Sequence, residues 1–88
     1  ANTAERLGRM FGITREECDL FGYRSQVNAK KARDAGWFDE ELVPVTVERG
    51  GSEPPITVKY DTHILEHCSL EAMAKLPPAF EAGGVITA

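Results

Sequence analysis

Apolar and polar positions form their longest helical pattern between Thr14 and Phe38. Thr14 is followed three residues later by Glu17, a capping-box spacing that predicts the start of a helix. Acidic residues crowd the first turn and basic residues the last turns, which is the order that a helix dipole favours. Gly36 is placed to end the helix. The pattern therefore predicts a rod of about 20 residues, roughly 30 Å long.

One face of this predicted helix is expected to pack along its length. Its members recur at spacings of three and four and are Cys18, Phe21, Ser25, Ala29 and Ala32. Gly22 costs a helix interior about 1 kcal/mol relative to alanine, so its presence indicates a close contact at that position. Trp37 and Phe38 follow the helix, and we expect them to anchor its end in a core.

Shorter elements are predicted on both sides of the long helix. The pattern from Thr3 to Phe11 predicts a short helix with its first residue as the N-cap and Gly12 as its end. Two β-branched runs, Leu42–Val47 and Ile56–Tyr60, predict the strands of a hairpin joined by a loop rich in glycine and proline. Pro44 places the first strand at an edge of the sheet.

The last part of the chain combines a helix with extended backbone. Ser69 is the predicted N-cap of a helix at Leu70–Leu76, which two prolines stop. Phe80 then stands in an extended segment, and Val85–Thr87 has a β-like composition. The whole pattern predicts an α+β fold with one long helix, two short helices and a small β-hairpin, in a single domain over residues 1–88.

Composition and charge narrow the possible functions. At 88 residues the chain suffices for one small domain, and its net charge of −4 argues against a nucleic-acid surface. The basic group at Lys30, Lys31 and Arg33 is expected to be a solvated helix end. No apolar run approaches the roughly 18 residues of a membrane span. Because the chain begins without methionine and stops in Ile-Thr-Ala, we expect it to be part of a longer protein.

The candidate reactive residues do not compose a catalytic set. Cys18 and Cys68 lie far apart in sequence, so reduced thiols in a cytosolic-type compartment are expected rather than a disulfide. His63 and His67 stand four apart and would share one face of a helix, yet no third metal ligand is evident and Glu66 does not fit the zinc-protease pattern. We therefore expect solvent-facing or hydrogen-bonded histidines and no metal. The adjacency of His67 and Cys68 leaves an activated thiolate as an alternative, although sequence neighbours rarely face each other.

Three motifs, in this order, carry a family resemblance. They are TAERLGRMFGITREECDLFGYRSQVNAKKA at Thr3–Ala32, GWFDEELVPV at Gly36–Val45 and SLEAMAKLPPAFEAGGVITA at Ser69–Ala88. Together they resemble the thiolases, the acetyl-CoA C-acyltransferases, over nearly the whole chain. The resemblance implies a fragment of the thiolase fold: most of the loop domain of the N-terminal half, which covers the active site and holds coenzyme A. It also implies that these residues contain no catalytic residue, because neither cysteine aligns with a reactive one.

The resemblance further implies a coenzyme A surface. By position in the third motif, the cofactor-binding residues are Ala72, Met73, Ala79, Phe80 and Ala88. Apolar walls with few polar anchors suit pantetheine, which is a long and weakly polar arm. Without the resemblance, Met73 and Phe80 fit equally well as core residues. One departure is Leu65, which stands where members commonly carry an arginine, a candidate contact to the nucleotide end of the cofactor.

The implied activity is the condensation of two acyl-CoA molecules or the thiolytic cleavage of a 3-ketoacyl-CoA, as in fatty acid metabolism and beta-oxidation. Coenzyme A and its esters are then substrates, and no permanently bound cofactor is expected. The implied partners are the remainder of the thiolase chain and a homodimeric or homotetrameric assembly, in the cytoplasm or in a mitochondrial or peroxisomal matrix and not secreted. Two alternatives stay open: a thiolase-like protein that binds CoA esters or lipids without catalysis, and a stand-alone interaction module built on the long helix.

Overall fold

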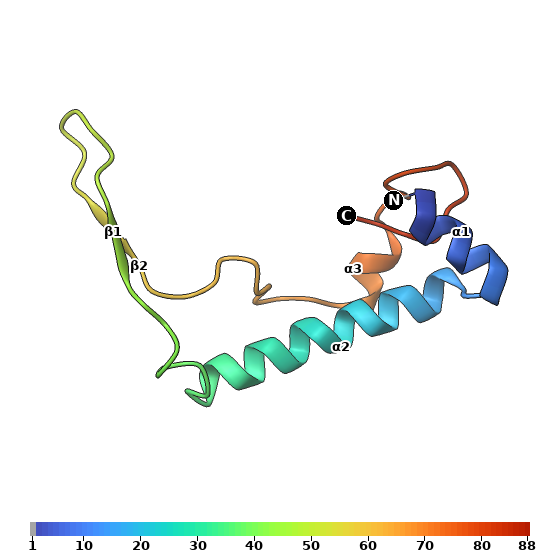
Figure 1. Ribbon diagram of the computed structural model, residues 1–88, viewed down its shortest axis with the longest axis horizontal. Helices are drawn as coiled ribbons and strands as arrows, with labels where there is room; N and C mark the ends of the chain where they lie inside the picture. Colours follow the sequence, from blue (N-terminus) through green and yellow to red (C-terminus); the bar gives the residue numbers. More distant parts are fainter. Residues whose placement is uncertain (1) are drawn as a thin grey trace.

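The computed structural model describes residues 2–88. The elements in chain order are α1 (Asn2–Phe11), α2 (Arg15–Asp34), β1 (Val45–Val47), β2 (Ile56–Val58) and α3 (Leu70–Ala74). Figure 1 shows α2 as a central rod, with α1, α3 and the C-terminus at one end and the hairpin of β1 and β2 extending away beyond the other. The predicted combination of one long helix, two short helices and a small hairpin is therefore confirmed.

Both predicted ends of α2 are confirmed by their hydrogen bonds. At the start, Thr14 has extended backbone angles and its hydroxyl accepts a hydrogen bond from the main-chain N–H of Glu17 at 3.1 Å. At the end, Gly36 has a φ of 76° and its N–H donates to the carbonyl of Arg33, while the N–H of Trp37 donates to that of Ala32. This pair of bonds is the Schellman motif, which requires a residue that tolerates a positive φ.

Several other boundaries differ from the sequence prediction. Helix α1 begins at Asn2, so Thr3 lies inside the helix and is not its N-cap, because threonine has ordinary propensity for a helix interior. Helix α3 stops at Ala74 and not at Leu76. Pro77 and Pro78 contribute to this early end, because they have no N–H to continue the helix and a proline disfavours helical backbone angles at the residue before it. Gly12 does end α1 as predicted, with a φ of 63°.

The two strands are shorter than predicted, with three residues each. Their antiparallel pairs are Val45 with Val58, Thr46 with Thr57 and Val47 with Ile56. Pro44 stands just outside β1 because it has no N–H to offer a ladder. Because side chains alternate along a strand, the four aliphatic residues share one face of the hairpin, opposite the threonines. All four are exposed, so nothing within residues 2–88 covers this face.

The β-like end of the chain also differs from the prediction. No strand is assigned at Val85–Thr87. The carbonyl of Ile86 instead accepts a single main-chain hydrogen bond from the N–H of Ala79, at 2.8 Å. One such bond closes a loop but does not build a ladder.

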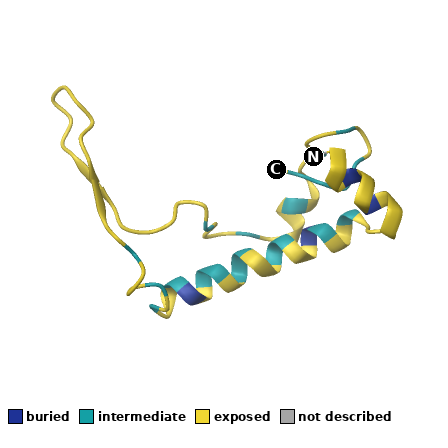
Figure 2. Ribbon diagram, in the orientation of Figure 1, coloured by how far each residue is buried: buried dark blue, intermediate teal, exposed yellow. Residues whose placement is uncertain are grey.

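The face of α2 that packs is only partly the one predicted, since Cys18 and Ala29 are half-buried. Phe21 is 79% exposed and Ser25 is exposed, although Ala32 is buried. The contacting face instead carries Arg15, Asp19, Gly22, Gln26, Lys30 and Arg33, again at spacings of three and four. Figure 2 shows buried and half-buried positions following one side of the rod. The reason is that the returning chain presents mainly main-chain groups and charges to α2, and these need polar partners.

The end of α2 does not lie in a core either. Trp37 is 76% exposed and Phe38 is half-buried, so the prediction of two core anchors is wrong for the tryptophan. Ala32 is the one buried hydrophobic residue among residues 2–88. None of the helices in the described range is both long and apolar enough to cross a membrane.

The molecule is extended for its size. Its radius of gyration is 17.5 Å, whereas a compact chain of this length has about 12 Å. Its accessible surface is 7110 Å², against about 5,100 Å² for a folded monomer of the same mass. The chain therefore leaves uncovered a large area that a self-contained domain would bury.

We expect the isolated chain to retain part of α2 and to lose the hairpin. A lone two-stranded hairpin is marginal in water, and the aliphatic face of this one is open to solvent. Amide hydrogen exchange of the isolated chain should show protection in the middle of α2 and none at Val45–Val47 or Ile56–Val58. Protected amides along both strands would contradict this expectation.

Candidate functional site

The predicted cofactor-binding residues lie on α3 and on the segment that follows it. Ala72 and Met73 lie on α3, Ala79 and Phe80 follow the proline turn, and Ala88 is the last residue of the chain. Figure 1 places α3 and this C-terminal segment beside α1 and the start of α2. Four of these five residues are exposed and Met73 is half-buried, so none is sealed in a core.

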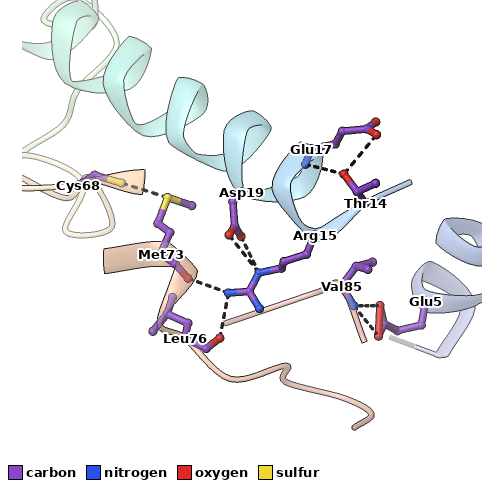
Figure 3. A network of polar contacts seen from close by, with 9 residues as sticks. All are labelled: Glu5, Thr14, Arg15, Glu17, Asp19, Cys68, Met73, Leu76 and Val85. Carbon is purple, nitrogen blue, oxygen red and sulfur yellow. Dashed lines mark hydrogen bonds and ion pairs between the residues drawn. The ribbon is translucent and has the colours of Figure 1, made fainter. Parts of the chain in front are cut away.

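Arg15 attaches α3 to α2. Its Nη2 donates to the carbonyl of Met73 at 2.7 Å and to that of Leu76 at 2.9 Å. Its Nε donates to both carboxylate oxygens of Asp19 at 3.0 Å, and the Asp19 side chain is 8% exposed. Figure 3 shows the guanidinium between the carboxylate and the two carbonyls. Arg15 thus holds one carbonyl within α3 and one just after it against the start of α2.

Met73 is fixed from two further directions. A Cβ added at Gly22 would lie 3.2 Å from the Cε of Met73, so the close contact predicted at this glycine is confirmed. On the other side, the Sγ of Cys68 donates a weak hydrogen bond to the Sδ of Met73 at 3.6 Å. The position of the methionine is therefore set by its main chain, by its methyl group and by its sulfur.

The other half of α2 carries a second attachment. Gln26 accepts a hydrogen bond from the N–H of Leu65 at 2.8 Å and donates to the carbonyl of His63 at 3.3 Å. Arg33 forms an ion pair with Glu66 at 2.6 Å, and Lys30 lies 3.7 Å from the same carboxylate. The basic group predicted as a solvated helix end is, for these two residues, part of a contact with the returning chain.

Titration behaviour follows from these contacts. The hydrogen bond from Arg33 lowers the pKa of Glu66 and, in return, raises the pKa of Arg33. Burial raises the pKa of Cys18, and the nearby carboxylate of Asp19 raises it further. A raised thiol pKa keeps the sulfur protonated, which is the opposite of what a nucleophilic cysteine needs.

The remaining reactive candidates are not assembled into a site. Cys68 hydrogen-bonds to Met73 and not to the neighbouring His67. His63 and His67 are exposed and lie in an irregular segment, so the one-face helical arrangement does not arise. Within residues 2–88 there is no group of three or more side chains arranged to hold a metal ion.

Sequence reasoning missed Arg15 and Glu5. The signal for Arg15 was its spacing of four from Asp19, which is also the spacing of an ordinary surface pair. Glu5 is 2% exposed and accepts hydrogen bonds from the main chain at Val85. A single glutamate on a short helix gives no sequence signal for a partner 80 residues away.

Comparison with known proteins relates this chain to the thiolases. The model of the thiolase N-terminal domain matches residues 1–88. An acetyl-CoA acetyltransferase of Syntrophomonas wolfei is 48% identical, covering 98% of this chain and 21% of that protein. A probable acetyl-CoA acyltransferase of Staphylococcus aureus is 42% identical, covering 98% and 22%. The chain thus spans about one fifth of the length of these relatives.

Solved structures agree in fold. The structure of the Syntrophomonas wolfei acetyl-CoA acetyltransferase matches with a TM-score of 0.86 and 48% identity, covering 97% of this chain and 21% of that chain. A human mitochondrial 3-ketoacyl-CoA thiolase in complex with CoA matches with a TM-score of 0.84 and 39% identity, covering 97% and 20%.

Replacing Arg15 with alanine should loosen α3 from α2. The change removes the donor that joins the Leu76 carbonyl and the partly buried Asp19 carboxylate to one another, at a cost of about 1–3 kcal/mol. Lysine should recover only part of this, because one ammonium does not reproduce the planar guanidinium. Denaturant unfolding of the protein that carries this chain measures the loss, and amide exchange at Met73–Leu76 locates it. An alanine variant as stable as the parent would refute the role of Arg15.

The contact of Glu66 with α2 should weaken in acid. A carboxyl group whose pKa is lowered on folding contributes its stabilisation fully above its unfolded pKa and loses it as the pH falls through the lowered folded value. NMR spectra of the segment around Leu65 should therefore change only at a pH below the ordinary pKa of a glutamate. Glu66→Gln should remove this dependence. A profile identical in the glutamine variant would assign the change to another group.

Proposed function

The chain belongs to the thiolase family, and on this premise we propose that it is part of an enzyme acting on acyl-CoA. The reaction is the condensation of two acyl-CoA molecules or the reverse, cleavage of a 3-ketoacyl-CoA by coenzyme A. The observation that carries the proposal is 48% identity to an acetyl-CoA acetyltransferase over 98% of this chain. A further relative, a human 3-ketoacyl-CoA thiolase, was solved in complex with CoA.

The role proposed for this segment is a cover that lines the coenzyme A site. Ala72, Met73, Ala79, Phe80 and Ala88 would face the cofactor. No catalytic residue is proposed among residues 1–88, so the reacting groups come from elsewhere in the protein. The cover acts by excluding water and by fixing the arm of the substrate, which favours a productive orientation.

The exposed side chains at this end of the fold suit such a ligand. Pantetheine is long and weakly polar, and it binds best against apolar walls with few polar groups. Phe80 is 53% exposed, so its ring is open to a ligand. Met73 is half-buried and fixed by the contacts to Gly22 and Cys68. The alanines at positions 72 and 79 leave space for close approach.

One observation favours an altered version of this function. Leu65 is 53% exposed and lines a cavity of about 340 Å³ together with Lys30 and Lys31. A leucine there offers no charge to the nucleotide end of coenzyme A, in contrast to an arginine. The alternative is therefore a thiolase-like protein that binds CoA esters or lipids without turnover. A stand-alone interaction module is disfavoured, because the chain exposes far more surface than a self-contained domain.

Assembly and location follow the same premise. The remainder of the thiolase chain is the first partner of this segment, and a homodimer or homotetramer is the proposed assembly. The proposed location is the cytoplasm or an organelle matrix. These statements rest on membership of the family.

Turnover of acetoacetyl-CoA by the whole protein tests the proposal. We expect thiolysis in the presence of coenzyme A. The measurement is the decrease in absorbance of the enolate of acetoacetyl-CoA. Phe80→Ala should raise the KM for coenzyme A roughly tenfold, because it removes an apolar wall that contributes about 1.5 kcal/mol or more. Phe80→Leu should keep most of the affinity.

Trp37→Ala is the matched control, because it removes another exposed aromatic ring, which follows the C-terminal end of α2. It should leave the KM unchanged. Binding of coenzyme A without turnover would favour the non-catalytic alternative. Absence of both binding and turnover in the folded protein would refute the proposed function.

A further inference from the structure

Glu5 is a buried carboxylate in a chain that buries little else. It is 2% exposed, although it lies on a helix whose other long side chains are exposed. A buried carboxylate is costly unless hydrogen bonds compensate for the loss of water. The partners of Glu5 therefore show what the residue holds in place.

The partner of Glu5 is the main chain of the last loop. Its Oε1 and Oε2 accept hydrogen bonds from the N–H of Val85 at 3.0 and 3.2 Å. Figure 3 shows the carboxylate of Glu5 turned towards Val85. A Cβ added at Gly84 would lie 1.7 Å from Oε2 of Glu5, so only glycine fits beside the carboxylate. The contact is thus both a hydrogen bond and a close steric fit.

The loop that Glu5 holds has little structure of its own. Gly83 has a φ of 73°, and no helix or strand is assigned between residues 75 and 88. One main-chain bond, from Ala79 to Ile86, closes the loop on itself. An ion pair between Arg9 and Glu81 adds a surface contact, with side chains 62% and 37% exposed. Glu5 therefore supplies the buried hydrogen bonds that attach this loop to α1, next to the packing of Val85 against Gly8.

We infer that Glu5 is a positioning residue for the acyl-CoA site. Its carboxylate fixes the loop at Gly84 and Val85, and through the Ala79–Ile86 bond it fixes the backbone that carries Phe80. This inference rests on the proposed function. Because Glu5 lies behind the loop and takes no part in bond making, its loss shifts the wall that binds the arm of coenzyme A and leaves the reacting groups unchanged.

The whole protein with Glu5→Ala and Glu5→Gln tests this inference. Alanine should raise the KM for coenzyme A roughly tenfold, the size expected for loss of a charge-assisted hydrogen bond, with kcat within about threefold. The amide oxygen of glutamine can still accept from Val85, so the KM should return to within about threefold of the parent. Arg9→Ala is the control and should leave the KM unchanged, since exposed ion pairs contribute little.

Gly84→Ala tests the same contact from the opposite side. The added methyl group collides with the carboxylate of Glu5, so this variant should also raise the KM. In the Glu5→Ala background the methyl group no longer meets the carboxylate, and only its tight approach to the carbonyl oxygen of Glu81, at 3.0 Å, remains. The two changes should therefore be far from additive. Additive effects would overturn the inference. If Glu5→Ala does not fold, the glutamine and Gly84→Ala variants decide the question.

Amide hydrogen exchange separates this inference from the proposed function. In Glu5→Ala, exchange should accelerate in the segment 79–88 and stay unchanged in the middle of α2. This readout needs no turnover, so it stands even if the protein is inactive towards acyl-CoA. Unchanged exchange at Val85, or a fall in kcat with an unchanged KM, would overturn the positioning role.

Discussion

The main chain between His63 and Leu76 takes several of its hydrogen-bond partners from side chains of α2. It runs back along α2 with only one helix of five residues, and main-chain groups without partners are costly when they are shielded from water. The side chains of α2 supply those partners at successive turns: Arg15 near the start, Gln26 in the middle and Lys30 towards the end. This requirement makes the packed face of α2 polar, and it decides which side of the rod the returning chain follows.

The loop at the C-terminal end of the chain also has a main-chain group paired with a side chain of a helix, here Glu5. Two of these hydrogen bonds between a side chain and a distant main-chain group are partly buried. In both, the side chain is charged: Arg15 at Met73 and Glu5 at Val85. Charge-assisted hydrogen bonds are roughly twice as strong as neutral ones, which suits positions where water no longer competes fully. Gln26, a neutral amide, holds the more exposed part of the returning chain. Charged side chains therefore make the partly buried hydrogen bonds to the main chain, and a neutral amide makes exposed ones.

The sequence predicted what local chemistry determines. Thr14 and Gly36 mark the ends of α2 because a capping hydroxyl and a positive φ act within a few residues. The packed face was predicted only in part, because small and apolar residues were taken to mark it. The segments that contact this face lie 36 to 61 residues further along the chain. The cofactor-binding residues were inferred from motif position alone, and they stay a prediction. Glu5 had no local signal, since its partner lies at the opposite end of the chain.

In this chain the partly buried contacts are polar hydrogen bonds and most of the large apolar side chains are exposed, which is the reverse of the usual arrangement in a small domain. A hydrogen bond contributes about 0.5–1.5 kcal/mol net, whereas burial of one large aliphatic side chain contributes about 1.5–3 kcal/mol. The hairpin face and Phe21 remain exposed, so most of the stabilisation available to this chain depends on a surface that covers them. Directional bonds meanwhile set its shape. The loop that carries Phe80 therefore keeps its position only while these hydrogen bonds are present, because no apolar core within residues 2–88 would hold it in their absence.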